Sequence, residues 1–320
     1  MRKQKKITKP VKIIIGIIIL ILILFIAFFT YTFKTLGKIN TVKLDTSNLE
    51  ISPNITNEVD LDEIRNIAIF GIDSKDEEIG RSDSIMILTI DKKHNKLKIS
   101  SIIRDSYVEI PGRDGKDKIN HAYAFGSVDG TENGGPTLAI KTLNRNFNLN
   151  IKDFLSVNFS SLPKLIDSIG GIDITITDEE LKLINENSTS QLSSSGTQKL
   201  NGSQTLAYSR IRYTAGGDFE RSHRHRTILT ALFNKLKSTS TTSYPGFLKE
   251  LLPLINTNMT STDIISLAFK INSLSSHELI QDRFPRDDCG EGQMINGIYY
   301  YVFDINETAK QMNDYIFLDK

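Results

Sequence analysis

Cysteine is almost absent from this 320-residue chain, which contains Cys289 and no second cysteine. An internal disulfide needs two thiols and a cysteine-rich metal site needs several, so both are excluded. We expect Cys289 to be a free thiol. The composition is otherwise that of a globular protein, with 39% hydrophobic and 24% charged residues, and the length suffices for one or two domains.

Acidic residues are missing from the first twelve positions, and charge of either sign is missing from the segment that follows. Residues 1–12, MRKQKKITKPVK, carry six lysines and arginines, and residues 13–33 contain no charged side chain. About 20 apolar residues are enough to cross a bilayer as a helix. The sequence therefore predicts a cytoplasmic basic tail at 1–12 and a transmembrane anchor at 13–33, with the remainder outside the cell.

A cleaved signal peptide is the alternative interpretation of this N-terminus. Its apolar region normally covers roughly 7–15 residues and is followed by a small-x-small cleavage site. The apolar segment here is longer, and no such site follows it. We therefore expect a single-pass protein of the cell membrane with a cytoplasmic N-terminus and an extracytoplasmic C-terminal domain.

Positive charge is not in excess over the rest of the chain, but it gathers in one segment. Without the six cations of residues 1–12, 33 Lys and Arg face 38 Asp and Glu, a net charge of −5. The segment 208–226, YSRIRYTAGGDFERSHRHR, nevertheless holds five arginines and two histidines. A nucleic-acid-binding domain would be basic overall, and genomic DNA lies on the other side of the membrane. We therefore expect no nucleic-acid partner, and a phosphate group on another molecule is the favoured ligand.

The pattern of apolar residues predicts a linker at 34–65 followed by one α/β domain at 66–320. Three strands are expected first, the second and third joined as a hairpin by the turn KKHN, at 66–73, 83–91 and 96–104. Helices and strands then alternate, with elements expected at 134–147, 154–160, 160–170, 171–177 and 219–236. The core face of the last helix is expected to comprise Ile228, Leu229, Leu232, Phe233 and Leu236. This order predicts a mixed central β-sheet sandwiched between helices.

Two aspartates, Asp73 and Asp83, flank the loop between the first two strands. If these strands are antiparallel neighbours, both carboxylates lie at one edge of the sheet, and the hairpin returns Arg104 to the same edge. Arg81 lies in the loop between the aspartates. Polar loop residues that cap strand ends are the simpler interpretation. Two carboxylates without His or Cys also suit Mg²⁺.

A glycosidase is the other function that a carboxylate pair can serve. Arginines argue against it here, because guanidinium groups match the geometry of phosphate and give no advantage to an oxocarbenium ion. In the segment 208–226, Arg221 and Arg224 share a face if the chain is helical, with His225 one turn from Arg221. Charge-assisted hydrogen bonds from such a cluster would hold a diphosphate.

Six motifs occur in order between Asn66 and Arg226, about half of the chain. They are NIAIFGIDSK, RSDSIMILTI, SIIRDSYVEIPG, KINHAYAFG, VNFSSLPKLIDSIGGIDITI and LNGSQTLAYSRIRYTAGGDFERSHRHR. In these motifs the chain resembles the LytR-CpsA-Psr family. The resemblance implies a mixed sheet between helices, an apolar pocket for a polyprenyl chain and an extracytoplasmic, Mg²⁺-dependent phosphotransferase.

The activity that the resemblance implies is the ligation of a glycopolymer, such as teichoic acid or capsule, to peptidoglycan. The donor would be an undecaprenyl-diphosphate-linked glycan and the acceptor a peptidoglycan hydroxyl. A phosphodiester would form and undecaprenyl phosphate would leave. Two further functions remain open: a lipid diphosphatase that uses the same site with water as acceptor, and a non-catalytic surface protein that binds lipid-linked glycan.

The resemblance also implies roles for individual residues. Asp73 and Asp83 would hold Mg²⁺, Lys118 and Asn120 would support the phosphate site, and Asp218 would either orient arginines or assist the acceptor hydroxyl. Catalysis is expected from Arg104, Asp218 and Arg221. The diphosphate is expected to contact Arg81, Arg104, Arg210, Arg212, Arg221, Arg224 and His225. The chain departs from the family's usual pattern at Lys75, where arginine is common, and at His225, where glutamine is common.

Overall fold

The computed structural model describes most of the chain after the predicted anchor: residues 40–44, 46, 48–52, 63–74, 80–129, 134–212, 217–240, 243–274 and 279–320. The predicted tail at 1–12, the predicted anchor at 13–33 and Lys75 lie outside these ranges. Within the described part of the chain, no helix combines the length and the apolarity of a membrane span.

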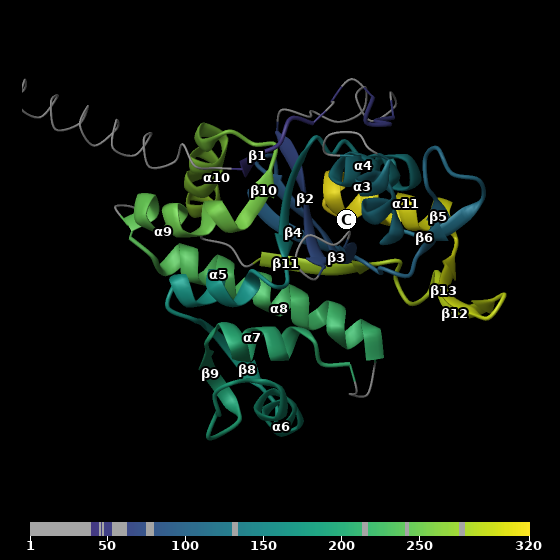
Figure 1. Ribbon diagram of the computed structural model, residues 1–320. Coiled ribbons are helices and arrows are strands. Elements are labelled where there is room, and N and C mark those ends of the chain that lie inside the picture. Colours follow the sequence, from purple (N-terminus) through teal and green to yellow (C-terminus); the bar gives the residue numbers. More distant parts are fainter. Residues whose placement is uncertain are drawn as a thin grey trace, which may run out of the picture.

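A seven-stranded mixed sheet forms the centre of the molecule (Figure 1). Its order from one edge to the other is β1 (Asn40–Thr41), β10 (Ile255–Thr257), β7 (Asp153–Asn158), β2 (Ile64–Asp73), β3 (Arg81–Asp91), β4 (Lys96–Ile102) and β11 (Leu279–Phe284). β2, β3 and β4 form an antiparallel meander, whereas β2 pairs parallel with β7 and β4 pairs parallel with β11. The predicted mixed central sheet and the predicted hairpin are both confirmed.

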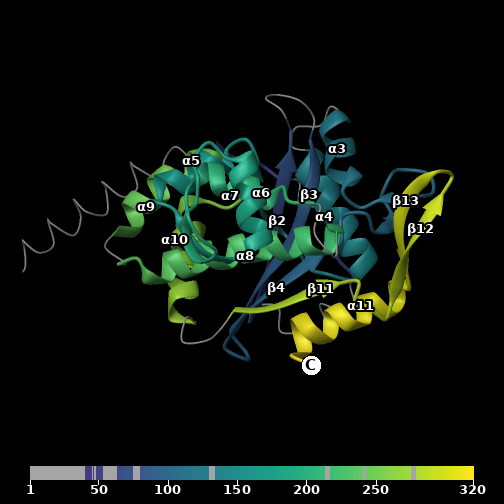
Figure 2. The same ribbon diagram turned by 90° about the horizontal axis from the view of Figure 1, so that it is seen from below.

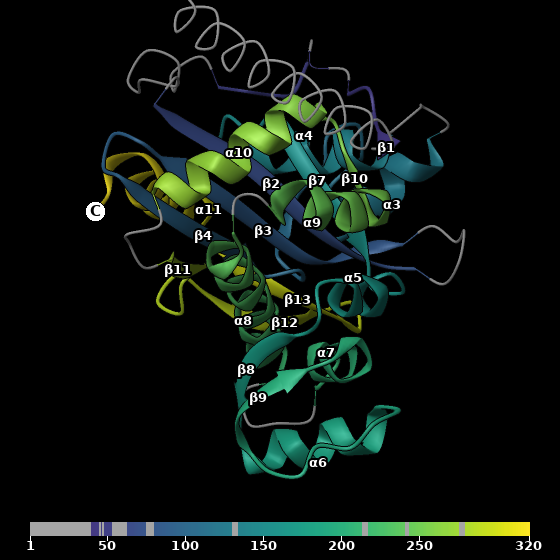
Figure 3. The same cartoon turned by 90° about the vertical axis from the view of Figure 1, so that its left-hand side faces the viewer.

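The sheet separates two helical layers (Figure 2). Successive side chains of a strand point to opposite faces, so β2 directs Ala68 and Phe70 to one layer and Ile67 and Ile69 to the other. The first layer comprises α3 (His121–Val128), α4 (Gly134–Phe147), α11 (Ile305–Asn313) and the π-helical turn η3 (Asp314–Leu318). The second comprises α8 (Gly217–Ser238), α9 (Tyr244–Leu251), the short 3-10 turn η2 (Leu252–Leu254) and α10 (Ser261–Ser273). Figure 3 looks onto the second layer, with α9 and α10 in front of the sheet.

A small lobe extends from the second layer beyond α8 (Figures 1 and 3). It contains α5 (Leu162–Ser168), β8 (Ile172–Ile176), α6 (Asp178–Asn187), β9 (Gly196–Leu200) and α7 (Gly202–Ser209). Capping boxes begin two of its helices: Thr177 with Glu180 at α6, and Asn201 with Gln204 at α7. Each box satisfies backbone amides that the first turn leaves unpaired.

Two short hairpins lie at the opposite side of the molecule from α9. One pairs β5 (Tyr107–Glu109) with β6 (Lys116–Lys118), and the other pairs β12 (Gly290–Ile295) with β13 (Ile298–Phe303). Asn296 and Gly297 form the turn of the second hairpin with φ of 51° and 80°. Positive φ at both central positions matches the twist of the strands, which explains the Asn-Gly pair.

Candidate active site

Asp83 lies at an irregularity in the pairing of β2 with β3. The antiparallel register joins Gly71 to Ser84 and Ile72 to Ser82, so Asp83 has no partner across the ladder. Such a β-bulge inserts one extra residue and re-aims its side chain. The Asp83 carboxylate reaches an arginine of α8, and its side chain is 10% exposed.

Three side chains from distant parts of the chain converge on Asp83. Arg104, after β4, places Nη1 2.8 Å from Oδ2, and Arg221 of α8 places Nη1 3.7 Å from the same oxygen. Asn120, before α3, donates Nδ2 to Oδ1 over 3.2 Å. The predicted meeting of Asp83 and Arg104 at one edge of the sheet is therefore confirmed. The functions assigned to these side chains stay predictions.

Asp105, which the sequence analysis did not single out, joins two of the cations. Its Oδ2 lies 3.2 Å from Arg104 Nε, and its Oδ1 lies 2.6 Å from Lys118 Nζ. The Asp105 side chain is 6% exposed, so it is an internal counter-charge. Its position directly after Arg104 in SIIRDSY is the sequence signal that could have identified it.

Backbone hydrogen bonds attach the KIN motif, residues 118–120, to Arg104 and to Ser82, the neighbour of Asp83. The Asn120 amide donates to the Arg104 carbonyl over 3.2 Å, and the Asn120 carbonyl accepts from the Ser82 amide over 3.3 Å. The side-chain Oδ1 of Asn120 is buried, and no donor within the described ranges reaches it. Buried acceptors are nearly always satisfied, so this oxygen beside Asp83 is a position where a ligand group is expected.

The remaining predicted side chains form an exposed rim. Asp73 lies directly across the ladder from Arg81, and its Oδ1 is 3.8 Å from Nη2 of Arg210. The Arg210 and Asp73 side chains are 58% and 43% exposed, so water screens this pair strongly. Because Asp73 reaches Arg210 after α7 and Asp83 reaches Arg221 in α8, both carboxylates face the α7–α8 segment.

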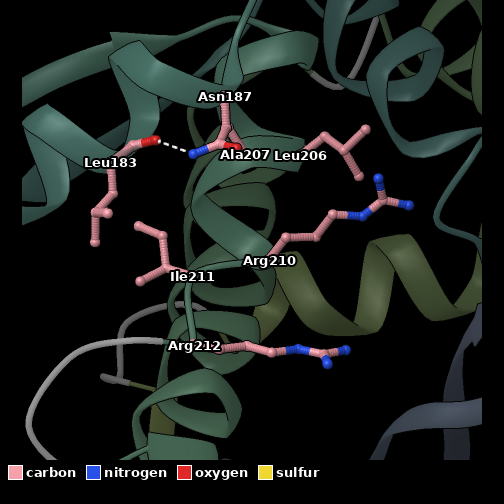
Figure 4. Close-up of a pocket in the computed structure, with 7 residues that line it drawn as sticks. All are labelled: Leu183, Asn187, Leu206, Ala207, Arg210, Ile211 and Arg212. Carbon is pink, nitrogen blue, oxygen red and sulfur yellow. Dashed lines mark hydrogen bonds between the residues drawn. The ribbon is translucent and has the colours of Figure 1, made fainter.

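Arg210 and Arg212 extend from the end of α7 in the same direction (Figure 4). They border a cavity of about 200 Å³ between α6 and α7. Its lining residues are Leu183, Asn187, Leu206, Ala207, Arg210, Ile211 and Arg212. Both guanidinium groups are thus available at the border of the charged cluster.

Arg224 and His225 lie deeper than the other predicted ligands. Arg224 is buried and donates Nε to Glu180 Oε1 over 2.8 Å and Nη1 to the Ile211 carbonyl over 3.3 Å. His225 is also buried, and its Nε2 donates to the Ser209 carbonyl over 3.1 Å. Both side chains therefore hold the end of α7, where Arg210 and Arg212 begin. Direct contact of either with a diphosphate stays a prediction.

Burial, with the neighbouring Arg221 guanidinium, lowers the pKa of the His225 imidazole to about 4. The ring is therefore neutral at pH 7, and it adds no charge to the cluster. The family commonly has glutamine, an uncharged side chain, at the position of His225. A neutral histidine, like glutamine, can donate a hydrogen bond to the Ser209 carbonyl.

The cluster carries more positive than negative charge. Five cations, Arg81, Arg104, Lys118, Arg210 and Arg221, accompany three carboxylates, Asp73, Asp83 and Asp105. The Asp218 side chain lies outside the described residues, so its predicted role is not addressed by the geometry. Within the described ranges, no three His, Cys, Asp or Glu side chains gather as a metal site. A surplus of about two positive charges suits a polyanionic ligand such as a diphosphate.

An apolar cavity of about 240 Å³ lies between the sheet and the α8–α10 layer. Its wall is entirely apolar and is supplied mainly by leucine and isoleucine. The lining residues are Ile69, Leu88, Ile99, Leu155, Val157, Leu165, Leu229, Leu232, Phe233, Leu236, Leu248, Leu251, Leu252, Ile255, Met259, Ile264, Leu267, Ala268, Ile271 and Leu279. No lipid-contacting residue could be predicted from the sequence, because leucines that line a cavity and leucines that fill a core form the same pattern.

One helix connects the charged cluster with the apolar cavity. α8 carries Arg221 in its first half and Leu229, Leu232 and Leu236 further along. At 1.5 Å per residue, Arg221 and Leu232 are separated by about 16 Å along the helix axis. This arrangement suits a ligand with a highly charged head and a long apolar tail.

Comparison with known proteins identifies similar chains. The family model described as the LytR_cpsA_psr family matches residues 26–316. A curated relative from Oceanobacillus iheyensis, the polyisoprenyl-teichoic acid–peptidoglycan teichoic acid transferase TagU, is 34% identical over 247 residues, which cover 77% of this chain and 73% of the relative.

Two solved structures with bound ligands show similar folds. TagT bound to LI-WTA superposes with a TM-score of 0.68 at 26% identity, over 86% of this chain and 99% of that one. The YwtF (TagT) protein with bound octaprenyl pyrophosphate lipid gives a TM-score of 0.65 at 25% identity, over 86% and 99%. The arrangement of sheet and helices described above is thus shared with proteins that bind such lipids.

Proposed function

Because the chain belongs to the LytR-CpsA-Psr family, we propose that it transfers a glycopolymer from a polyprenyl diphosphate carrier to peptidoglycan. The carrier would be undecaprenyl diphosphate, and the acceptor a hydroxyl group of peptidoglycan. Support comes from relatives named as teichoic acid transferases and from a similar structure with octaprenyl pyrophosphate. The single observation that carries the proposal is the charged cluster at one end of α8 and the apolar cavity along the other.

The proposed binding mode places the diphosphate at the cluster and the prenyl tail in the cavity. Arg104 and Arg221 would meet the diphosphate beside Asp83, and Arg210 and Arg212 would approach it from the rim. Each charge-assisted hydrogen bond contributes roughly 1.5–3 kcal/mol. Burial of the tail contributes about 0.8 kcal/mol per CH₂ group. Head and tail together would hold the donor far more tightly than either alone.

In the proposed reaction, the acceptor oxygen attacks the phosphorus atom that carries the glycan. A new P–O bond forms the phosphodiester, the bridging P–O bond breaks, and undecaprenyl phosphate leaves with the bridging oxygen. Fixed guanidinium groups stabilise the charge that develops on the oxygens. Asp218 at the start of α8 is proposed either to take the proton of the acceptor hydroxyl or to orient the arginines.

Magnesium is proposed as the cofactor because the oxygen atoms available at this edge fit its preferences. Asp73 and Asp83 supply carboxylates, and Asn120 adds a buried amide oxygen without a described donor. Mg²⁺ accepts oxygen ligands and usually retains waters and phosphate oxygens. When bound, it would neutralise part of the charge of the diphosphate.

The place of action is proposed to be the outer surface of the cell membrane. Residues 13–33 would anchor the chain, and the six cations of 1–12 would remain in the cytoplasm. An anchored domain meets a membrane-embedded donor without searching the bulk solution. A fusion reporter at the C-terminus tests this topology, and a cytoplasmic C-terminus would contradict it.

The decisive experiment combines the full chain in detergent with a polyprenyl-diphosphate-linked glycan, peptidoglycan and Mg²⁺. Covalent attachment of the glycan to peptidoglycan is expected. Arg104→Ala is expected to lower the rate about 10²–10³-fold, because it removes a fixed donor for developing charge. Arg113→Ala removes an exposed arginine paired with Asp129 and is expected to leave the rate unchanged.

The dependence of donor consumption on acceptor distinguishes the proposed transferase from a lipid diphosphatase. The transferase requires acceptor for donor consumption, and its cleaved carrier is undecaprenyl phosphate. Donor hydrolysis at the same rate with and without peptidoglycan would identify the diphosphatase instead. Tight donor binding with no product at any Mg²⁺ concentration would identify a non-catalytic binding protein.

A further inference from the structure

The β12–β13 hairpin projects beyond the edge of the sheet (Figures 1 and 2), and it carries exposed apolar side chains. Met294 and Tyr299 are paired across the hairpin and are 66% and 42% exposed. An exposed apolar patch that projects from a globular domain commonly marks an interaction site. None of these residues belongs to the diphosphate cluster or to the apolar cavity.

One face of the hairpin combines glycines with aromatic rings. Gly290 is opposite Phe303, Gly292 is opposite Tyr301, and both strands direct these positions to the same face as Tyr299. A Cβ atom at Gly292 would lie 2.6 Å from the Tyr299 ring, closer than such contacts allow. Glycine is therefore required for the Tyr299 ring to lie over the β12 backbone with its outer side toward solvent.

Contacts between aromatic rings continue from the hairpin to α8. The Tyr301 ring meets the Phe219 ring edge to face at a centroid distance of 5.8 Å. The Arg283 guanidinium lies 4.2 Å from the centroid of the same Phe219 ring. Phe219 precedes Arg221 by two residues at the start of α8. Tyr301 is only 3% exposed, whereas the Tyr299 and Phe219 rings are 42% and 36% exposed. We call these three residues the aromatic strip: two exposed rings, with buried Tyr301 between them, lead from the hairpin toward the charged cluster.

The root of the hairpin is attached to the cluster itself. The Tyr301 amide donates to the Asp105 carbonyl over 2.9 Å, and the Asp105 carboxylate pairs with Arg104 and Lys118. On the other face of the hairpin, the Tyr300 ring lies 5.6 Å from Lys118 Nζ. A molecule on the aromatic strip would therefore be adjacent to the side chains proposed to hold the diphosphate.

We propose that the aromatic strip binds the saccharide chain of the acceptor and delivers its hydroxyl group to the cluster. This inference rests on the proposed transferase function and names the acceptor side of that site. Pyranose rings have apolar C–H faces that pack on aromatic rings, while their hydroxyl groups stay hydrated or meet polar groups such as the tyrosine hydroxyl. The strip exposes two separate rings, Tyr299 and Phe219, and this spacing suits a linear glycan better than a single small ligand.

The position of the strip favours a cell-wall glycan over the lipid bilayer. β1 and β11 are the opposite edges of the sheet, and the hairpin follows β11. Six interstrand spacings of about 4.8 Å place these edges roughly 29 Å apart. Residues 34–39 can span at most about 22 Å between the proposed anchor and β1. The anchor would therefore hold the β1 edge near the membrane and leave the hairpin on the far side.

Direct binding of soluble, peptide-free peptidoglycan glycan chains to the full chain in nanodiscs tests the inference. Tyr299→Ala is expected to weaken binding about three- to tenfold through the loss of one stacking ring. Gly292→Ala should weaken it in the same direction, because the added Cβ displaces the ring without removing it. Ile298→Ala is the matched control: it truncates an exposed residue of the same hairpin on the opposite face.

Kinetics then separate acceptor binding from donor chemistry. Tyr299→Ala should raise the KM for the acceptor and leave the KM for the lipid donor unchanged, and Tyr299→Phe should restore the wild-type value. Arg104→Ala should lower the transfer rate about 10²–10³-fold yet retain glycan binding. If the wild-type chain binds glycan but transfers nothing, the proposed function fails and glycan recognition by the strip stands.

Three results would overturn the inference while leaving the transferase intact. The first is unchanged glycan affinity in both Tyr299→Ala and Gly292→Ala. The second is loss of binding to vesicles of anionic phospholipid in these variants, which would identify a bilayer contact. The third is a change from dimer to monomer in sedimentation, which would identify a contact between two copies of the chain.

Discussion

The two faces of the central sheet are both covered by apolar side chains but are packed differently. On the α3–α4–α11 face, Phe70, Phe147 and Phe154 are fully buried and fill the space between strands and helices. On the α8–α10 face, leucine and isoleucine predominate and surround the cavity of about 240 Å³. The first face is closely packed and stabilises the fold, whereas the second is less completely packed because it contains the cavity.

This difference fits the proposed function, in which one face of the sheet is packed core and the other would bind the lipid tail. Removal of packing atoms costs free energy in proportion to the void that remains. A cavity that persists in the folded chain therefore lowers the free energy of unfolding relative to a fully packed core. Occupation by a prenyl chain would return those contacts, which links binding of the donor to stability of the domain.

The largest expected contrast comes from truncation on the two faces. Phe154→Ala on the closed face should lower the free energy of unfolding by about 3–5 kcal/mol, because it removes a whole ring from close packing. Leu267→Ala on the cavity face should cost about 2 kcal/mol, the low end of the range for leucine. Urea denaturation of the full chain in detergent measures both. Equal losses would contradict the comparison.

A smaller loss of stability is expected at acid pH, because His225 of α8 is buried as a neutral imidazole. The folded pKa of about 4 lies below the value near 6.5 expected for the unfolded chain. The contribution of the neutral imidazole is thus complete above about pH 6.5 and decreases toward pH 4, by about 3 kcal/mol at most.

Denaturation at pH 7.5 and pH 4.5 measures this dependence. His225→Gln should reduce it, since glutamine can donate to the Ser209 carbonyl but does not titrate. Exposed His223→Gln on the same helix is the control and should behave like the wild type. If His225→Gln leaves the acid sensitivity unchanged, His225 is not its source.

The smallest expected effect comes from adding volume to two matched alanines. Ala139 in α4 and Ala268 in α10 are each 4% exposed, but only Ala268 lines the cavity. Ala139→Leu should destabilise the fold by about 1–3 kcal/mol through overpacking. Ala268→Leu should change stability by less than about 1 kcal/mol, because the cavity accepts the added carbons.

In a lipid-binding assay, Ala268→Leu should be the more strongly affected of these two variants. Ala268→Leu should weaken binding of octaprenyl diphosphate, whereas the folded fraction of Ala139→Leu should bind normally. Fluorescence titration with the soluble diphosphate lipid in detergent would show this. Unchanged affinity in Ala268→Leu would separate the cavity from the lipid tail.

Much of the fold and part of the site could be predicted from the sequence. Alternation and turn residues identified β2, β3 and β4, and antiparallel pairing was enough to bring Arg104 to Asp83. Helical spacing placed Arg221 and Arg224 on the same helix. These inferences succeeded because they depend on local periodicity and on the return of a hairpin.

Features that depend on distant partners could not be predicted. Arg224 pairs with Glu180, 44 residues earlier in the chain and in a helix that the sequence analysis did not identify. Asp105 is an internal counter-charge only because Lys118 lies beside it. The cavity was hidden because packing density, unlike hydrophobicity, leaves no periodic pattern among leucines.

The bulge at Asp83 has a consequence for how this domain can change. A strand without residue 83 would join Ser82 and Ser84 in sequence and restore an uninterrupted ladder opposite Gly71 and Ile72. The repaired sheet would lack the carboxylate that gathers Arg104, Arg221 and Asn120. An uninterrupted ladder and the present position of the Asp83 carboxylate therefore exclude one another. Deletion of residue 83 would restore the ladder and remove the carboxylate, and insertion of an aspartate into the repaired strand would do the reverse.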